Sequence, residues 1–104
     1  MSGDPLNLPK AAFAEAVGSS FRARVGPDAI ELELASLRDG IESSVVEQFT
    51  LMFRGPLDAP LRQGTYALDN ARIGEIPLFL VPVGRDERGY EYEAVFNRFV
   101  DQSV

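Results

Sequence analysis

The sequence contains no cysteine and no histidine, and these two absences exclude much of the usual chemistry of enzymes. Without cysteine there is neither a disulfide framework nor a thiolate nucleophile. Without histidine the chain lacks the commonest general base and the commonest zinc ligand. Lys10 is the only lysine, so a Ser–Lys dyad would have to form at the start of a predicted helix. We therefore expect no catalytic residues, no metal and no cofactor, and we predict that the protein is not an enzyme.

Basic residues are also scarce: ten Lys and Arg stand against sixteen Asp and Glu, which gives a net charge of −6. Nucleic acids and anionic membranes bind to basic surfaces, so we expect neither as a partner. No apolar run approaches the roughly 20 residues of a membrane span. The N-terminus also shows neither the basic nor the apolar region of a secretory signal. Together with the lack of cysteine, these features favour a cytoplasmic location.

Apolar residues make up 45% of the 104 residues, which is enough for one hydrophobic core, and their spacing changes once along the chain. In the short stretch that begins at Pro9, Phe13 and Val17 lie four residues apart. This spacing predicts a short helix that buries both side chains on one face. Beyond this stretch, apolar and polar residues alternate, which is typical of β-strands with one buried face.

About six alternating segments follow the helix, separated by turn signals roughly every 8–15 residues. This spacing predicts a mainly β fold, a small antiparallel six-stranded barrel or roll with one short N-terminal helix. Residues 39–44 are expected to be a loop. Residues 74–98 predict a central hairpin. Its first strand has apolar residues on both faces, which predicts burial on both sides or a strand covered by the helix. We expect residues 1–8 to form a flexible lead-in and residues 9–104 to form a single β domain.

The turns predict where a binding surface could lie. If the strands form an up-and-down meander, alternate loops share one end of the barrel. Residues 26–28, 55–63 and 84–89 would then meet, and loops held on a rigid scaffold often carry binding residues. The candidate binding rim at this end consists of Arg54, Arg62, Gln63, Arg85 and Arg88. The secondary candidates, which would lie at the opposite end, are Asn97 and Arg98.

A purely structural interpretation of the same residues stays open. The arginines of the rim are matched in number by four carboxylates, so that this end would have no net charge: Asp28, Asp58, Asp86 and Glu87. The arginines could equally serve as partners of nearby carboxylates, and Gln63 and Asn97 as hydrogen-bonding groups at turns and strand ends.

Four short sequence blocks occur together in this chain: FTLMFRGP at residues 49–56, RQGTY at 62–66, PLFLVPV at 77–83 and YEAVFNR at 92–98. As a set they resemble a family of small bacterial domains of unknown function, over roughly residues 10–98. The resemblance brings no catalytic residues. It implies genes that sometimes neighbour those for phage-tail-collar-like proteins, and hence an accessory or assembly role.

These observations predict a non-enzymatic binding or assembly module whose partner is a protein, which the resemblance extends to a phage-tail-like partner. A sheet that does not fully close would leave an edge with which another strand can pair. The alternative is a small β-barrel that binds a small apolar ligand, in a cavity between the helix and the strand at residues 78–83. The sequence leaves the oligomeric state open.

Overall fold

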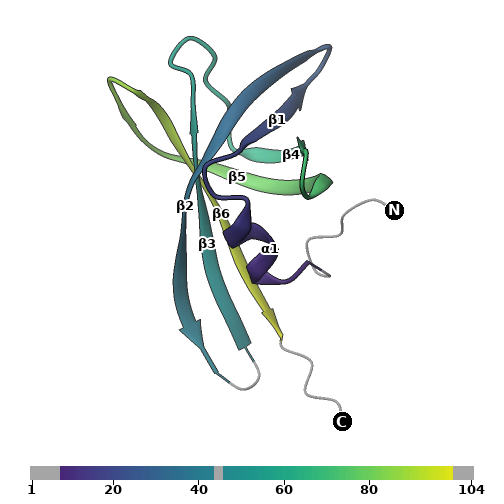
Figure 1. The fold of residues 1–104 in the computed structure, drawn as a ribbon. Helices are drawn as coiled ribbons and strands as arrows, with labels where there is room; N and C mark the ends of the chain where they lie inside the picture. The colour runs from purple at the N-terminus through teal and green to yellow at the C-terminus, as the bar shows by residue number, and fades with distance from the viewer. Residues whose placement is uncertain (1–7, 44–45, 100–104) are drawn as a thin grey trace.

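The protein folds into one short helix and six strands over the residues that the computed structural model describes, 8–43 and 46–99 (Figure 1). Every ladder is antiparallel, and the strands close into a barrel in the order β1-β2-β3-β6-β5-β4. The mainly β fold with six antiparallel strands and one helix is therefore confirmed. The elements are α1 (Lys10–Glu15), β1 (Ser20–Val25), β2 (Asp28–Glu42), β3 (Val46–Gly55), β4 (Gly64–Asn70), β5 (Gly74–Asp86) and β6 (Gly89–Phe99).

Alternation of apolar and polar residues places one face of each strand in the interior. In β1, Phe21 and Ala23 are fully buried, whereas Arg22 and Arg24 are exposed. The interior is filled by large side chains from α1 and all six strands. The bulkiest of them, all essentially without solvent exposure, are Tyr92, Phe13, Phe21, Phe49, Phe53, Leu32, Leu34, Leu51, Leu68, Ile76 and Leu80.

The order of the strands differs from the predicted meander. β3 pairs with β6, and β4 pairs with β1, so the chain crosses the barrel end through residues 56–63. The β3–β6 ladder brings aromatic residues opposite one another: Phe53 faces Tyr92, and the rings of Phe49 and Phe96 stack at 4.6 Å. Such cross-strand aromatic pairs stabilise a ladder between strands that are far apart in sequence. The meander is therefore wrong.

Strand direction nevertheless alternates along the chain, because every ladder is antiparallel. The β1–β2 turn, the β3–β4 connection and the β5–β6 turn consequently lie at the same end, as predicted, although Figure 1 shows that they splay apart. We call this end the turn end.

Two local predictions are wrong. Residues 39–42 were expected in a loop, but β2 continues to Glu42 because its ladder with β3 absorbs irregularities through register shifts; residues 44–45 lie outside the described residues. Val17 is 40% exposed, because α1 ends at Glu15 and Ala16 takes the buried position. Of the predicted lead-in, only Leu8 is described, and it packs against the core.

The helix packs against the interior of the barrel at the end opposite the turn end. Phe13 is fully buried, with its ring centroid 5.1 Å from that of Phe96 and 6.0 Å from that of Phe49. Lys10 reaches from the start of α1 to Asp39 of β2, with Nζ 2.6 Å from Oδ1. Phe13 of the helix is thus part of the hydrophobic core at this end of the barrel.

β5 and β6 form the predicted hairpin only near its turn, where residues 81–86 pair with residues 89–93. Beyond this point β5 pairs with β4 and β6 pairs with β3, so the two strands diverge (Figure 1). The expected burial of both faces of β5 is therefore wrong: Phe79 is 51% exposed and Val83 is 46% exposed. Pro82 lies at a register shift, which suits a residue without an N–H to donate.

Candidate binding site

At the turn end, Arg54 forms ion pairs that link two parts of the fold. Its guanidinium nitrogens lie 3.2 Å from Asp86 Oδ1 and 3.4 Å from Glu91 Oε2. These contacts tie the end of β3 to the β5–β6 turn. The charge of Arg54 is therefore already compensated by two carboxylates, which leaves little of it for an external anion.

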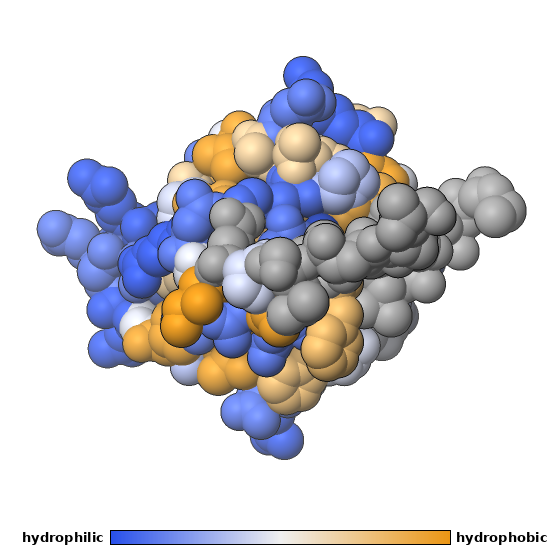
Figure 2. All heavy atoms as spheres, turned by 90° about the horizontal axis from the view of Figure 1, so that it is seen from below, coloured by the Kyte–Doolittle hydropathy of each residue, from blue (hydrophilic) through white to orange (hydrophobic). Residues whose placement is uncertain are grey.

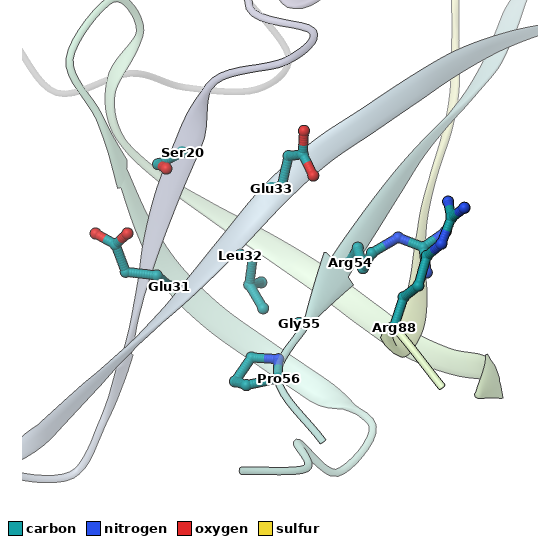
Figure 3. Close-up of a pocket in the computed structure, with 8 residues that line it drawn as sticks. All are labelled: Ser20, Glu31, Leu32, Glu33, Arg54, Gly55, Pro56 and Arg88. Atoms are coloured by element: carbon teal, nitrogen blue, oxygen red, sulfur yellow. The ribbon is translucent and has the colours of Figure 1, made fainter. Parts of the chain in front are cut away.

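The other members of the predicted rim do not form one cluster. Arg62, Gln63 and Arg88 are exposed, and the Arg85 guanidinium lies 5.9 Å from the centre of the Tyr90 ring. Of these residues, Arg54 and Arg88 line the same groove, a hollow of about 380 Å³. Figure 3 shows the carboxylates of this groove on one side and its arginines on the other; the lining residues are Ser20, Glu31, Leu32, Glu33, Arg54, Gly55, Pro56 and Arg88. Two acidic and two basic side chains give it no net charge.

The β5–β6 turn is fixed by Asp86. Its Oδ1 accepts hydrogen bonds from the backbone N–H groups of Arg88 at 2.8 Å and Gly89 at 3.2 Å. The N–H of Arg88, with Arg54 nearby, holds the pKa of the Asp86 carboxyl below its ordinary value. Gly89 has φ +153°, and a Cβ at this position would lie 2.2 Å from the carbonyl oxygen of Gly55. This close approach explains why residue 89 is glycine. Gly55 has a different reason, because a Cβ there would lie 2.6 Å from Leu32 Cδ2 and 3.1 Å from Tyr92 Cε2.

The β3–β4 connection is held by a buried hydrogen bond. The backbone N–H of Leu61 donates to Tyr92 Oη at 2.9 Å, and both residues are buried. Desolvation raises the pKa of the Tyr92 phenol. Tyr92 therefore positions the connection and is closed to a ligand.

Asn70 plays the matching role at the other end of the barrel. It is the buried polar residue of the described core, and all its hydrogen-bonding capacity is used within the fold. Its Nδ2 donates to Ser19 Oγ and to the Ser20 carbonyl, and its Oδ1 accepts from the N–H groups of Arg72 and Ile73. Asn70 is thus a structural residue.

A second hollow lies where β5 and β6 diverge, and we call it the β5–β6 opening. It has a volume of about 260 Å³ and is lined by residues 77–79 of β5 and residues 94–98 of β6. Both secondary candidates line it. Asn97 is exposed, whereas Arg98 is half-buried, pairs with Glu47 at 2.9 Å and lies over the Phe49 ring at 5.2 Å. The structure therefore separates them from the predicted rim.

Exposed apolar side chains surround this opening, although the sequence pattern predicts burial for Phe79 and no site at Val95 or Phe99. Phe79 is 51%, Val95 62% and Phe99 86% exposed. Seen from the end opposite the turn end, the surface shows hydrophobic residues between hydrophilic ones (Figure 2). A signal existed in the sequence: Val95 stands between Ala94 and Phe96, whose side chains already fill the inner face of the strand.

The opening also exposes two strand edges. Residues 94–99 of β6 pair only with β3, and residues 74–80 of β5 pair only with β4, within the described chain. A strand edge presents unpaired N–H and C=O groups that can bind another strand. Pro77 lacks an N–H and so weakens the β5 edge, whereas the β6 edge contains no proline.

Other classes of site find no support in the part of the chain that the structure describes. No group of three or more Asp, Glu, His or Cys side chains is placed to hold a metal ion. Among the same residues, no helix is long and apolar enough to cross a membrane.

Comparison with known proteins places the chain in a family. A family model described as a domain of unknown function (DUF6916) matches residues 8–96, a span that runs from the approach to α1 into β6. No curated protein and no solved structure matches the chain.

Proposed function

The chain belongs to the DUF6916 family of domains of unknown function, and from its strand edges we propose that it is a non-enzymatic binding module for another protein. The partner would contribute an extended segment that pairs with the free edge of β6. This mode of binding takes its affinity from main-chain hydrogen bonds and its specificity from alternate side chains. We further propose an assembly role in the cytoplasm.

The observation that carries the proposal is the divergence of β5 from β6. It leaves residues 94–99 with one paired edge and one unpaired edge, beside a groove of about 260 Å³. Proteins usually protect such edges with charges, prolines or covering loops. On β6 the outward residues here are instead Val95, Asn97 and Phe99, which carry no charge.

Because side chains fill the interior, a site on the surface is favoured in preference to an internal ligand cavity. The small apolar ligand of the alternative would lie between α1 and β5, yet Leu78 and Leu80 of β5 are buried in the same cluster as Phe13. The hollow beside Leu78 is the β5–β6 opening, which lies at the surface between the two strands. An extended chain fits such a shape better than a compact small molecule.

The proposal can be tested with ¹⁵N-labelled protein and an uncharged, end-capped peptide in which Val and Thr alternate. We expect chemical-shift changes in residues 94–99 of β6 and in the facing residues of β5, and few at the turn end. Val95→Lys, which places a charge on the edge, should abolish binding. Leu57→Lys is the matched control, because Leu57 is also a partly exposed apolar residue, 43% exposed, but lies in the β3–β4 connection.

The result against the proposal would be shifts confined to the turn end, or equal binding by both lysine variants and the wild type. Both variants should unfold at the same denaturant concentration as the wild type, since surface substitutions usually change stability by about 0.5 kcal/mol or less. A binding loss in Val95→Lys alone can then be assigned to the edge.

A further inference from the structure

We infer that the segment which pairs with β6 carries a Lys or Arg opposite Val95 and an apolar residue opposite Phe99. This inference rests on the proposed function and adds the chemistry of the partner. It follows from the side chains that would neighbour an added strand on the outer face of the sheet.

One carboxylate without an ion-pair partner among the described residues, that of Glu93, lies at the end of the β5–β6 opening where the two strands still pair. Glu93 is the last β6 residue that still pairs with β5, opposite Val81, and its other cross-strand neighbour is Met52 of β3. Both neighbours are apolar, and no cation of the described chain forms an ion pair with Glu93. The other carboxylates near the opening already have partners: Glu47 pairs with Arg98 and Glu75 with Arg24.

An added strand begins one step beyond this carboxylate. Its first outward position lies opposite Val95, because Val81 occupies the position beside Glu93. A residue opposite Val95 has Glu93 as its diagonal neighbour, about 7–8 Å away, which is within reach of a long side chain. A Lys or Arg can lay its methylene stem over the exposed Val95 and Phe79 while its charged group approaches Glu93.

At the other end of the β6 edge, the partner residue should be apolar and not charged. Phe99 is 86% exposed, and its neighbour on β3 is Val46. An apolar side chain opposite Phe99 would remove these two residues from water. Asn97, between them and Val95, has Gln48 as its neighbour and sets no charge preference.

A second copy of the chain does not meet these requirements. The edge of a second β6 could offer only Arg98 as a cation, and Arg98 is already engaged with Glu47 and the rings of Phe49 and Phe96. With a net charge of −6, two copies also repel each other. The charge pattern therefore favours a different protein with a basic, strand-forming segment.

The test uses three end-capped peptides of alternating Val and Thr that differ at one outward position, which is Lys, Met or Glu. We expect the Lys peptide to bind about fivefold more tightly than the Met peptide at low salt, and the Glu peptide to bind more weakly. The preference should shrink at 1 M salt, because exposed charges are then screened. Glu93→Gln should equalise the three affinities, whereas Glu87→Gln, in the β5–β6 turn, should leave the preference unchanged.

The outcomes separate this inference from the proposed function. Equal binding of all three peptides to the wild type would overturn the inference and leave strand addition standing. Failure of every peptide to bind at millimolar concentration would overturn the proposed function itself. Concentration-dependent dimerisation of the wild type, abolished by Val95→Lys in sedimentation experiments, would make a second copy the occupant and contradict the inference.

Discussion

Removal of one oxygen atom tests whether the β3–β4 connection is fastened as the structure shows. In Tyr92→Phe the ring stays in the core, but the buried N–H of Leu61 loses its acceptor at 2.9 Å. A buried donor without a partner costs about 1–3 kcal/mol of stability. For a domain of about 100 residues, this lowers the melting temperature by roughly 5 °C or more. Urea unfolding, with an unchanged dependence on denaturant, measures the loss directly.

Tyr66→Phe is the matched control. Its hydroxyl donates to the carbonyl of Arg62 at 2.6 Å, but this bond is exposed and water can replace it. We expect a change of about 0.5 kcal/mol or less. Equal stability of the two variants, or a loss below about 0.5 kcal/mol in Tyr92→Phe, would refute the stabilising role of the buried hydrogen bond from Leu61 to Tyr92.

The same hydroxyl predicts a pH dependence. Burial raises the pKa of Tyr92 in the folded protein above its ordinary value of 10.0. The stabilisation from the neutral phenol is therefore fully present below pH 10 and is lost as the pH rises through the raised pKa. Ultraviolet titration of the phenolate should show Tyr92 ionising above pH 10, and this late phase should be missing in Tyr92→Phe.

Three further substitutions or titrations follow from the contacts of the fold. Asn70→Asp should cost about 1–3 kcal/mol in urea unfolding, because a carboxylate cannot donate to the Ser20 carbonyl; full stability would contradict the assigned contact. Gly89→Ala should also cost about 1–3 kcal/mol or more of stability, since its Cβ would collide with the Gly55 carbonyl oxygen at a strained φ. Unchanged stability would contradict the close contact between residues 89 and 55. Asp86 should titrate below its ordinary 3.8 in an NMR pH series, and its contribution to stability, present above that pH, should be lost as the pH falls through the lowered pKa; a midpoint above 3.8 would contradict this.

The sequence was sufficient to predict the strands and the core, because alternation is a local property. Phe49, Leu51 and Phe53 follow one another at every second position, and all three are buried. The crossing of the chain from β3 to β4 could not be predicted. It depends on which strand lies beside β3, and the match between Phe49 and Phe96 is recognisable only once the register is known.

The candidate site was predictable only in part. Asn97 and Arg98 do line the β5–β6 opening, but a pattern of period two does not tell whether the outer face of a strand is covered. The outward apolar residues of β5 therefore predicted burial, whereas Phe79 is half-exposed because β6 turns away. The binding role of the rim at the turn end stays a prediction, although Arg54 is now known to pair with two carboxylates.

Hydrogen exchange along β6 tests the proposed binding edge most directly. In the free protein, alternate amides of residues 94–99 should exchange quickly, because they point into the opening, while those bonded to β3 exchange slowly. Addition of the Lys-containing strand peptide should slow the fast set and leave the turn end unchanged. Slow exchange of every one of these amides in the free protein, or no slowing on binding, would contradict the claim that β6 offers a free edge.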